Sequence, residues 1–315
     1  MKPLYLTEEH VRRLLPMRDC IGLLKKAFQT LSTGEAINQP RRRLLLPTRT
    51  MLHYMAAGDG RYLGIKTYAT NPQHGAHFVF LLFRAEDGEL LAILEANHLG
   101  QIRTGAASGL ATGLLARPEA RTVGLIGSGF QALTQLEATM AVRPVDSARV
   151  WSRSPEKREA FAAEGRRRFG IPVEAATSAE TALRDADIVI TATNAAEPVL
   201  ESSWISAGTH VNAMGSNQAR RRELPADLVK RASLIVVDSR EQSRMESGDL
   251  LMALEEGDWD RVVELQEIAA GRGGRTAPED LTLFKSNGIA LEDVVAAGYV
   301  YERAMEAGIG REPYS

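Results

Sequence analysis

The fold is decided by the stretch Arg121-Thr-Val-Gly-Leu-Ile-Gly-Ser-Gly-Phe-Gln-Ala132, which a helical pattern and the run Ala148-Arg-Val-Trp-Ser152 follow. Its first, apolar part has the length and β-branched content of a buried parallel strand. The part after it fits G-x-G-x-x-A, in which the first glycine permits a tight turn, the second admits a pyrophosphate, and alanine allows close helix packing. The sequence therefore predicts a dinucleotide-binding turn, with a purely structural glycine turn as the alternative. Its residues are Gly127, Ser128, Gly129, Gln131 and Ala132.

The end of the second strand bears on which dinucleotide binds. An NAD site usually carries Asp or Glu about 20 residues beyond the glycines, where it accepts from the ribose 2′-hydroxyl. This chain has Ser152-Arg153-Ser154 there, which offers a guanidinium and two hydroxyls without a carboxylate. A charge-assisted hydrogen bond contributes about 1.5–3 kcal/mol, so Arg153 favours the 2′-phosphate of NADP. We expect NADP, with NAD as the alternative; Ser154 can also serve simply as a helix cap.

Further strands of the same parallel sheet are expected at residues 187–193, 209–214, 234–238 and 281–284. Ligands of such sheets bind beyond the carboxyl ends of the strands. Small hydroxylated residues stand at the end of the first of these strands, and Arg103-Thr104 near the start of a linking helix could bind a pyrophosphate. The additional residues expected at the cofactor are Thr104, Thr191, Ala192, Thr193, Met214 and Ser286.

The first ~95 residues have a different organisation, because short strands separated by turns dominate them. Thr7 is expected to cap a helix that ends near Gly34, and a helix at 290–307 is expected to pack back on this region. Strands are predicted at 43–46, 51–56, 62–68, 78–84 and 90–95. The predicted fold class is α/β. A Rossmann doubly wound parallel sheet occupies 116–288, and residues 1–115 with 289–315 form a smaller β-rich α+β substrate-binding and dimerisation domain.

Composition limits the classes of function. The net charge of -2 with 25% charged residues indicates neither a nucleic acid nor a membrane surface as partner. The single cysteine, Cys20, excludes an internal disulfide, and the scattered histidines offer no metal-binding pair. No apolar signal core or membrane-spanning run is present in the sequence. We therefore expect a cytoplasmic protein without a metal ion.

Three groups of basic residues stand on a predicted strand, before a predicted strand or near the start of the linking helix. Lys66 interrupts the apolar strand Leu63-Gly-Ile-Lys-Thr-Tyr68, Arg41-Arg-Arg43 precedes another, and Arg103 lies near the start of the linking helix. An ammonium on such a strand must face water or a polar cleft, and a guanidinium suits bidentate capture of a carboxylate. Taken singly, each of these residues is more simply explained as a solvated charge.

A set of motifs spans nearly the whole chain: Gln39-Pro40-Arg41-Arg42, Gly64-Ile-Lys66-Thr, Arg103-Thr104-Gly-Ala-Ala-Ser108, Gly127-Ser-Gly-Phe-Gln-Ala132, Thr191-Ala-Thr193, Gly215-Ser-Asn217, Arg222-Glu-Leu224, Asp238-Ser-Arg-Glu241, Glu246-Ser-Gly-Asp249 and Leu281-Thr-Leu-Phe-Lys-Ser286. On these motifs the chain resembles the ornithine cyclodeaminase/μ-crystallin family of NAD(P)-dependent imine and amino-acid enzymes. The resemblance implies that Arg42 and Arg103 grip a substrate carboxylate and that Lys66 polarises or protonates the reacting group. It also implies a homodimer formed through the β-rich domain, which the exposed strand edges expected there favour as well.

One motif differs from the pattern of the cyclodeaminase branch of the family. The cyclodeaminase and alanine dehydrogenase branches carry Asp where this chain has Asn217, and Asn cannot take a proton from an alkylammonium. The resemblance therefore favours NADPH-dependent reduction of a cyclic ketimine such as Δ1-pyrroline-2-carboxylate or Δ1-piperideine-2-carboxylate, with Asn217 among the candidate catalytic residues. The alternatives are ornithine cyclodeaminase, alanine-dehydrogenase-type deamination, a 3-hydroxyproline dehydratase, and a non-catalytic NADP-dependent binding protein.

Overall fold

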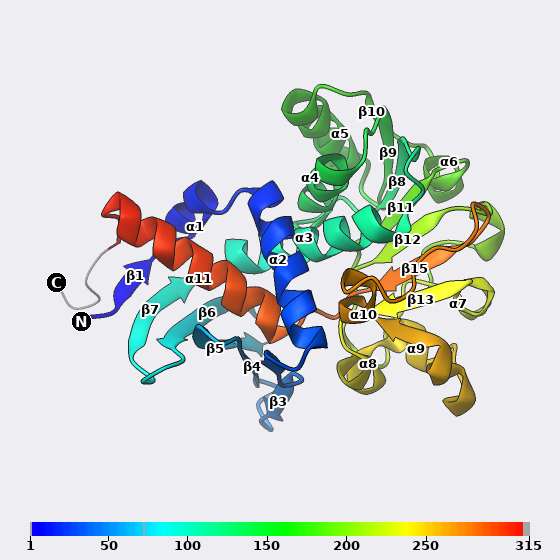
Figure 1. The fold of residues 1–315 in the computed structure, drawn as a ribbon. Helices are drawn as coiled ribbons and strands as arrows, with labels where there is room; N and C mark the ends of the chain where they lie inside the picture. The colour runs from blue at the N-terminus through cyan, green and yellow to red at the C-terminus, as the bar shows by residue number, and fades with distance from the viewer. Residues whose placement is uncertain (1, 72, 311–315) are drawn as a thin grey trace. The chain divides into compact units, whose positions relative to one another are not determined.

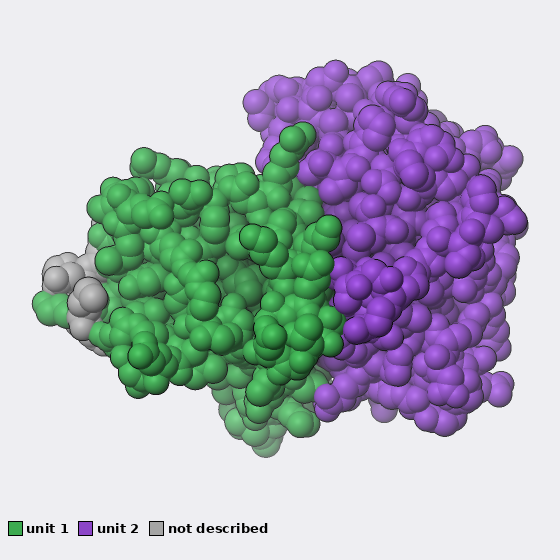
Figure 2. Space-filling view, viewed as in Figure 1, with its two compact units in different colours: residues 1–106, 288–315 green, residues 107–287 purple. Residues whose placement is uncertain are grey.

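The computed structural model describes residues 2–71 and 73–310 (Figure 1). The chain forms two compact units, which Figure 2 colours separately: unit 1 comprises residues 1–106 and 288–315, and unit 2 comprises residues 107–287. The first boundary falls inside helix α3 (Asn97–Leu115), whereas the sequence suggested the end of that helix. The two ends of the chain thus belong to the same unit.

Unit 1 is built on a seven-stranded sheet in the order β1-β7-β6-β5-β4-β2, with β3 paired to β4. The strands from β4 to β7 are antiparallel to one another, as predicted, and β1 runs parallel to β7. The sequence missed β1 and β2, because two or three residues are too few to show an alternating pattern. The strands are β1 (Leu4–Leu6), β2 (Ile37–Asn38), β3 (Arg42–Leu45), β4 (Met51–Gly58), β5 (Tyr62–Asn71), β6 (His74–Arg84) and β7 (Leu90–Glu95).

Three helices lie wholly in unit 1: α1 (Glu8–Leu14), α2 (Met17–Ser32) and α11 (Ala290–Ala307). Helix α11 packs on the sheet and against α2 (Figure 1). Thr7 caps α1 as predicted, but the single helix expected from there to Gly34 is wrong. The break occurs at Pro16, which has no N–H to continue α1 and stands at the N-cap of α2.

The two faces of this sheet differ in what covers them. Along β4, His53 and Met55 are buried, whereas the alternating Leu52 and Tyr54 are exposed. Strand pairing places residues of β3 and β5 on the same exposed side. We call this side the outer sheet face, and its large apolar side chains, which are 39–56% exposed, are Leu44, Leu52, Tyr54 and Leu63.

Unit 2 contains an eight-stranded sheet in the order β10-β9-β8-β11-β12-β15-β13-β14, in which every pair is parallel. The first strand of this sheet, β8, lies in its middle. The chain then adds β9 and β10 on one side of β8, and returns to add β11 and β12 on the other side. This is the doubly wound Rossmann order, so the predicted fold class is confirmed. The strands are β8 (Thr122–Ile126), β9 (Ser147–Trp151), β10 (Val173–Ala175), β11 (Ile188–Thr191), β12 (His210–Ala213), β13 (Leu234–Val237), β14 (Val262–Glu264) and β15 (Thr282–Lys285).

Each face of the parallel sheet has its own apolar core. In β8, Leu125 contributes to one core and the next residue, Ile126, to the other, because successive strand residues point to opposite faces. The helices of unit 2 are α4 (Ala132–Val142), α5 (Pro155–Phe169), α6 (Ala179–Leu183), α7 (Ala226–Arg231), α8 (Arg240–Glu246), α9 (Gly248–Leu251) and α10 (Leu265–Ala269). None of the helices in residues 2–71 and 73–310 combines the length and apolarity that a membrane span requires.

Candidate functional site

A buried cluster of charges lies in unit 1, where side chains of β5, α3 and the first turn of α11 meet. Lys66 Nζ lies 2.9 Å from Asp293 Oδ1, and Arg103 Nε lies 3.1 Å from the same oxygen. Arg103 Nη1 lies 2.8 Å from Glu292 Oε2. Lys66 and Arg103 are only 3% and 7% exposed, so their interpretation as solvated charges is wrong.

These contacts change the ionisation of the cluster. Burial lowers the pKa of Lys66 to about 8; Asp293 opposes the shift, and the positive charge of Arg103 adds to it. Burial acts to raise the pKa of Asp293, but the charges of Arg103 and Lys66 outweigh it and hold that pKa below its ordinary value. Lys66 is therefore a buried acid that can release its proton at mildly alkaline pH.

The structure separates the neighbouring arginines. Arg42 is exposed and belongs to the outer sheet face. Arg41 is 4% exposed, and its Nη2 donates to the carbonyl oxygen of Gly288 at 3.2 Å. Its charge also contributes to lowering the pKa of Lys66, as expected of a near neighbour. The fold thus brings Arg41 together with Lys66 and Arg103, and it leaves Arg42 on the other side of the sheet.

Aromatic rings border the Lys66 ammonium. Lys66 Nζ lies 5.4 Å from the centroid of the Phe78 ring, Phe78 contacts Tyr68, and the Tyr68 ring stacks on His53 with centroids 4.4 Å apart. Burial, followed by the charges of the adjacent arginines, lowers the pKa of His53 to about 4, so this ring is neutral at pH 7. The cluster therefore combines an ammonium and two guanidinium groups with a flat, uncharged wall.

Sequence reasoning missed Asp293 and His53. Asp293 lies in the first turn of α11, where an acidic residue favourably faces the positive end of the helix dipole. Its type and position in the sequence therefore did not indicate a role in a site. His53 could have been found from strand alternation, because it pairs with Tyr68, two residues beyond Lys66 on the same face of β5.

In unit 2 the glycine-rich turn has the geometry that its sequence predicts. Gly127 has a φ of +110°, and a Cβ there would lie 2.4 Å from the Ala192 carbonyl oxygen, so only glycine fits. A Cβ on Gly129 would meet nothing within 4 Å among the described residues. Helix α4 starts at Ala132, and no side chain of the described residues caps it at Gln131. Its first N–H groups suit an anion such as a pyrophosphate.

The end of β9 differs from the prediction in one respect. Arg153 is exposed, and Ser128 Oγ donates to Ser152 Oγ at 2.8 Å. Ser154 caps α5 by accepting from the Lys157 N–H at 3.2 Å, and its own hydroxyl donates to Glu156 Oε2 at 2.8 Å. The expectation that no carboxylate stands at this strand end is therefore wrong, because Glu156 folds back onto Ser154.

The turns after β11 and β12 are tied to one buried carboxylate, that of Glu223 in the motif Arg222-Glu-Leu224, to which the sequence assigned no role. Glu223 Oε2 accepts from the Thr191 hydroxyl at 2.8 Å and from the Gly215 N–H at 2.7 Å, and Oε1 accepts from the Thr193 N–H at 2.6 Å. The hydroxyl of Thr191, which the sequence placed beside the cofactor, thus donates its hydrogen bond to Glu223. Burial raises the pKa of Glu223, although the Thr193 hydrogen bond opposes this.

Thr104 follows Arg103 on α3 in unit 1, and the remaining predicted residues belong to unit 2. Ala192 and Asn217 are half-buried, Met214 accepts at Sδ from the Ser108 hydroxyl at 2.9 Å, and the Ser286 hydroxyl donates to Asp238 Oδ2 at 3.1 Å.

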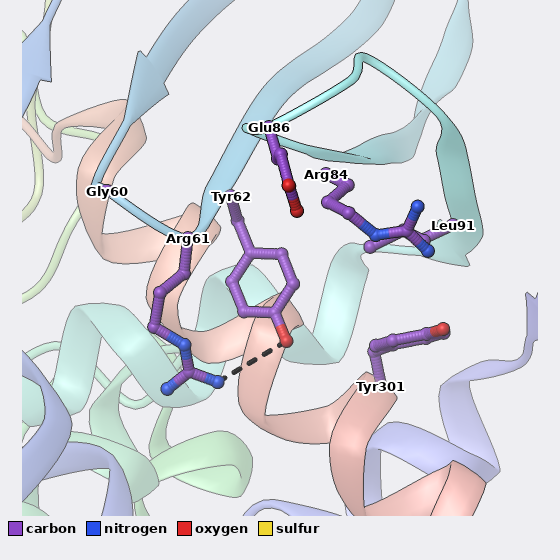
Figure 3. Close-up of a pocket in the computed structure, with 7 residues that line it drawn as sticks. All are labelled: Gly60, Arg61, Tyr62, Arg84, Glu86, Leu91 and Tyr301. Carbon is purple, nitrogen blue, oxygen red and sulfur yellow. Dashed lines mark hydrogen bonds between the residues drawn. The ribbon is translucent and has the colours of Figure 1, made fainter.

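A pocket of about 290 Å³ opens elsewhere in unit 1, near the β4–β5 turn (Figure 3). None of the predicted site residues lines it. Tyr62 in its wall donates to Glu302 at 2.7 Å, and Arg84 lies 2.7 Å from Asp87, so carboxylates already match its charges. Its lining residues are Gly60, Arg61, Tyr62, Arg84, Glu86, Leu91 and Tyr301. Within residues 2–71 and 73–310 no cluster of His, Cys, Asp and Glu could hold a metal ion.

Comparison with known proteins bears on this geometry. The chain is 36% identical over 320 residues to a protein of Bacillus cereus described as Delta(1)-pyrroline-2-carboxylate reductase, covering 98% of each chain. It matches the structure of the Thermococcus litoralis enzyme of that name in complex with NADH and L-proline, with a TM-score of 0.93, 36% identity and 98% and 99% coverage. It also matches an archaeal alanine dehydrogenase dimer with bound NAD, with a TM-score of 0.93, 31% identity and 99% and 98% coverage.

A family model matches residues 1–308, which is nearly the full length of the chain. The match includes both the charge cluster of unit 1 and the glycine-rich turn of unit 2. The chain therefore belongs to the ornithine cyclodeaminase/mu-crystallin family.

Proposed function

We propose that the protein reduces the carbon–nitrogen double bond of a small cyclic imine carboxylate, such as Δ1-pyrroline-2-carboxylate or Δ1-piperideine-2-carboxylate, to the L-imino acid. The observation that carries the proposal is the buried cluster that joins Lys66, Arg103 and Arg41. The bacterial and archaeal relatives support this class of substrate, since they share the fold and more than a third of the sequence.

The chain's own groups supply what such a reduction needs besides hydride. NADPH or NADH supplies a hydride to the imine carbon when bound. Lys66 Nζ holds a proton for the imine nitrogen, and its lowered pKa of about 8 makes that proton easier to release. Arg41 and Arg103 present guanidinium groups to the carboxylate and so fix the orientation of the ring. We assign to Arg41 the role that the resemblance gave to Arg42.

The turn of unit 2 fits a dinucleotide, because Gly129 borders open space and the start of α4 has no side-chain cap among the described residues. We propose that this turn holds the pyrophosphate, that Arg153 contacts the adenosine ribose or its phosphate, and that Asn217 serves the substrate end. Because Glu156 stands beside Ser154, both NADP and NAD are proposed as cofactors.

We further propose a homodimer in the cytoplasm. The outer sheet face leaves several large apolar side chains exposed in a single chain, and a second copy would cover them. The archaeal alanine dehydrogenase of the same fold is a dimer, which supports this assembly. The one cysteine of the chain is buried, as suits a reducing compartment.

The test is oxidation of NADPH and NADH, followed by absorbance, against a panel of cyclic imine carboxylates. Pyruvate with ammonia, and ornithine with NAD, are run in parallel. We expect turnover with a cyclic imine, and a loss of about a hundredfold or more in kcat for Lys66→Ala with cofactor affinity unchanged. Turnover of ornithine or pyruvate alone, or a Lys66→Ala variant with full kcat, would contradict the proposal.

A further inference from the structure

We infer that Glu223 is a positioning residue, whose buried carboxylate sets the turns after β11 and β12 at the geometry that cofactor and substrate require; this inference rests on the function proposed above. Glu223 is 0% exposed and accepts three hydrogen bonds of 2.6 to 2.8 Å from two different turns. These turns lie at the carboxyl ends of adjacent parallel strands, where dinucleotides bind in this fold.

The atoms around the Glu223 carboxylate are packed so closely that residue 215 has no room for a side chain. A Cβ on Gly215 would lie 2.4 Å from the Glu223 carboxylate and 2.2 Å from the Thr193 carbonyl oxygen. The absence of a side chain at Gly215 therefore lets its backbone N–H reach the carboxylate directly. One side chain thereby joins the segment 191–193 to the segment 213–217, which carries Asn217.

Glu223 is itself held by a second buried pair. Asp249 Oδ1 accepts from the backbone N–H groups of Glu223 and Leu224 at 2.6 and 2.9 Å. Asp249 Oδ2 lies 3.2 Å from Lys285 Nζ, and Lys285 Nζ donates to the Ser216 carbonyl oxygen at 2.5 Å. The turn that carries Asn217 is thus fixed from both sides, by Glu223 at the N–H of residue 215 and by Lys285 at the C=O of residue 216.

A carboxylate is required because all three partners are donors. In Glu223→Gln, the amide oxygen can serve only one side, and the amide NH₂ must face either the Thr193 N–H or the Gly215 N–H. The substitution keeps the size of the side chain but sets the amide NH₂, a donor, against a backbone N–H, which is also a donor. We expect this repulsion to displace one turn from the other. The glycine-rich turn after β8 and the residues after β9 make no hydrogen bond to Glu223. Gly127 packs against the Ala192 carbonyl, but its own N–H donates to the Trp151 carbonyl oxygen at 2.8 Å, so this turn should keep its geometry better than the two segments that Glu223 joins.

The experiment compares the affinities of NADH and ADP-ribose in wild type and Glu223→Gln. ADP-ribose lacks the nicotinamide and probes the turns after β8 and β9. We expect the variant to lose about ten- to a hundredfold in NADH affinity and in kcat, and less than about twofold in ADP-ribose affinity. Hydrogen exchange without ligand should become faster in segments 191–195 and 213–218 only.

The matched control is Asp187→Asn. Asp187 bridges the opposite, amino ends of β8 and β11, accepting from Arg121 N at 2.9 Å and Thr122 N at 3.0 Å. Its substitution should lower the melting temperature but keep the ratio of the two affinities. Equal losses of NADH and ADP-ribose in Glu223→Gln, or unchanged exchange in segment 213–218, overturn the inference. If wild type reduces no imine, the proposed function fails, whereas the exchange measurement still decides the role of Glu223.

Discussion

The ionisation of Lys66 sets the pH range in which it can give up a proton. Its pKa is lowered to about 8, so the acid form dominates below that pH and disappears above it. We expect kcat/KM for the imine to be level in mildly acidic to neutral buffer. It should fall about tenfold for each pH unit above pH 8. A pH profile of initial rates checks this.

Asp293→Asn is the informative variant for that profile. The carboxylate favours the ammonium form of Lys66, so its removal should move the fall in kcat/KM to lower pH. Asp87→Asn is the control, because Asp87 pairs with Arg84 at the surface and should leave the profile in place. A profile that shifts equally in both variants would show that Lys66 is not the group observed.

The two neighbouring arginines can be separated by a pair of substitutions. Arg41→Ala removes a buried guanidinium near Lys66, and it should raise KM for the imine carboxylate about tenfold or more while kcat falls less. Arg42→Ala removes an exposed charge and should leave KM within about twofold. Steady-state kinetics on both variants measures KM. A larger rise in KM for Arg42→Ala than for Arg41→Ala would show that Arg42, and not Arg41, binds the carboxylate.

We expect cofactor preference to depend on two opposed charges after β9, those of Arg153 and Glu156. Arg153→Ala should weaken NADPH about tenfold and leave NADH nearly unchanged, because only NADPH carries the extra phosphate. Glu156→Gln should act in the other direction and favour NADPH, since it removes a carboxylate beside Ser154. Titration of each cofactor by fluorescence gives the ratio, and Glu159→Gln on the same helix serves as control. Equal losses for both cofactors in Arg153→Ala would assign it a structural role.

Residue type and position marked Lys66 and Arg103 as unusual, but only the family resemblance gave them a role, because a solvated charge explained each of them equally simply. Their partners could not be found in the same way. Asp293 lies 227 residues from Lys66, and only the packing of α11 on the sheet brings the two together. For the same reason Arg41 and Arg42 could not be told apart before the side of β3 that faces the cluster was known.

At the scale of elements, the turn between β8 and α4 contains two glycines with different duties. Gly127→Ala should destabilise the protein by about 1–3 kcal/mol or more, because the positive φ is strained and the Cβ would meet the Ala192 carbonyl. Gly129→Ala should leave the melting temperature unchanged, because its Cβ meets no described atom within 4 Å, and should weaken cofactor binding. Thermal melts with cofactor titration separate the two effects; a stable Gly127→Ala protein would contradict this reading of the turn.

Elements with a long and regular pattern were predicted well, and short ones were not. The closing helix was expected at 290–307 and α11 spans Ala290–Ala307. Strands β10 and β14 have three residues each, so neither alternation nor length distinguished them from loops. The position of β15 between β12 and β13 was also beyond the sequence, because strand order depends on packing of distant segments.

At the scale of the whole molecule, the outer sheet face should be the dimer interface. Leu52→Arg places a charge among its apolar side chains and should convert the dimer to a monomer. Met305→Arg is the control, because Met305 is also exposed and apolar but lies on α11. Sedimentation velocity over a range of concentrations measures the mass of the assembly. If Leu52→Arg is still a dimer, the interface does not lie on the outer sheet face.

The composition of unit 1 from both ends of the sequence has a consequence for synthesis on the ribosome. Lys66 emerges 227 residues before Asp293, which at about 5–20 residues per second leaves a delay of roughly 10–45 s. During this interval the strand that bears Lys66 has neither its carboxylate nor the helix that covers its sheet, and the whole of unit 2, residues 107–287, is synthesised. We therefore expect nascent chains to expose apolar strands that chaperones can bind until α11 is translated.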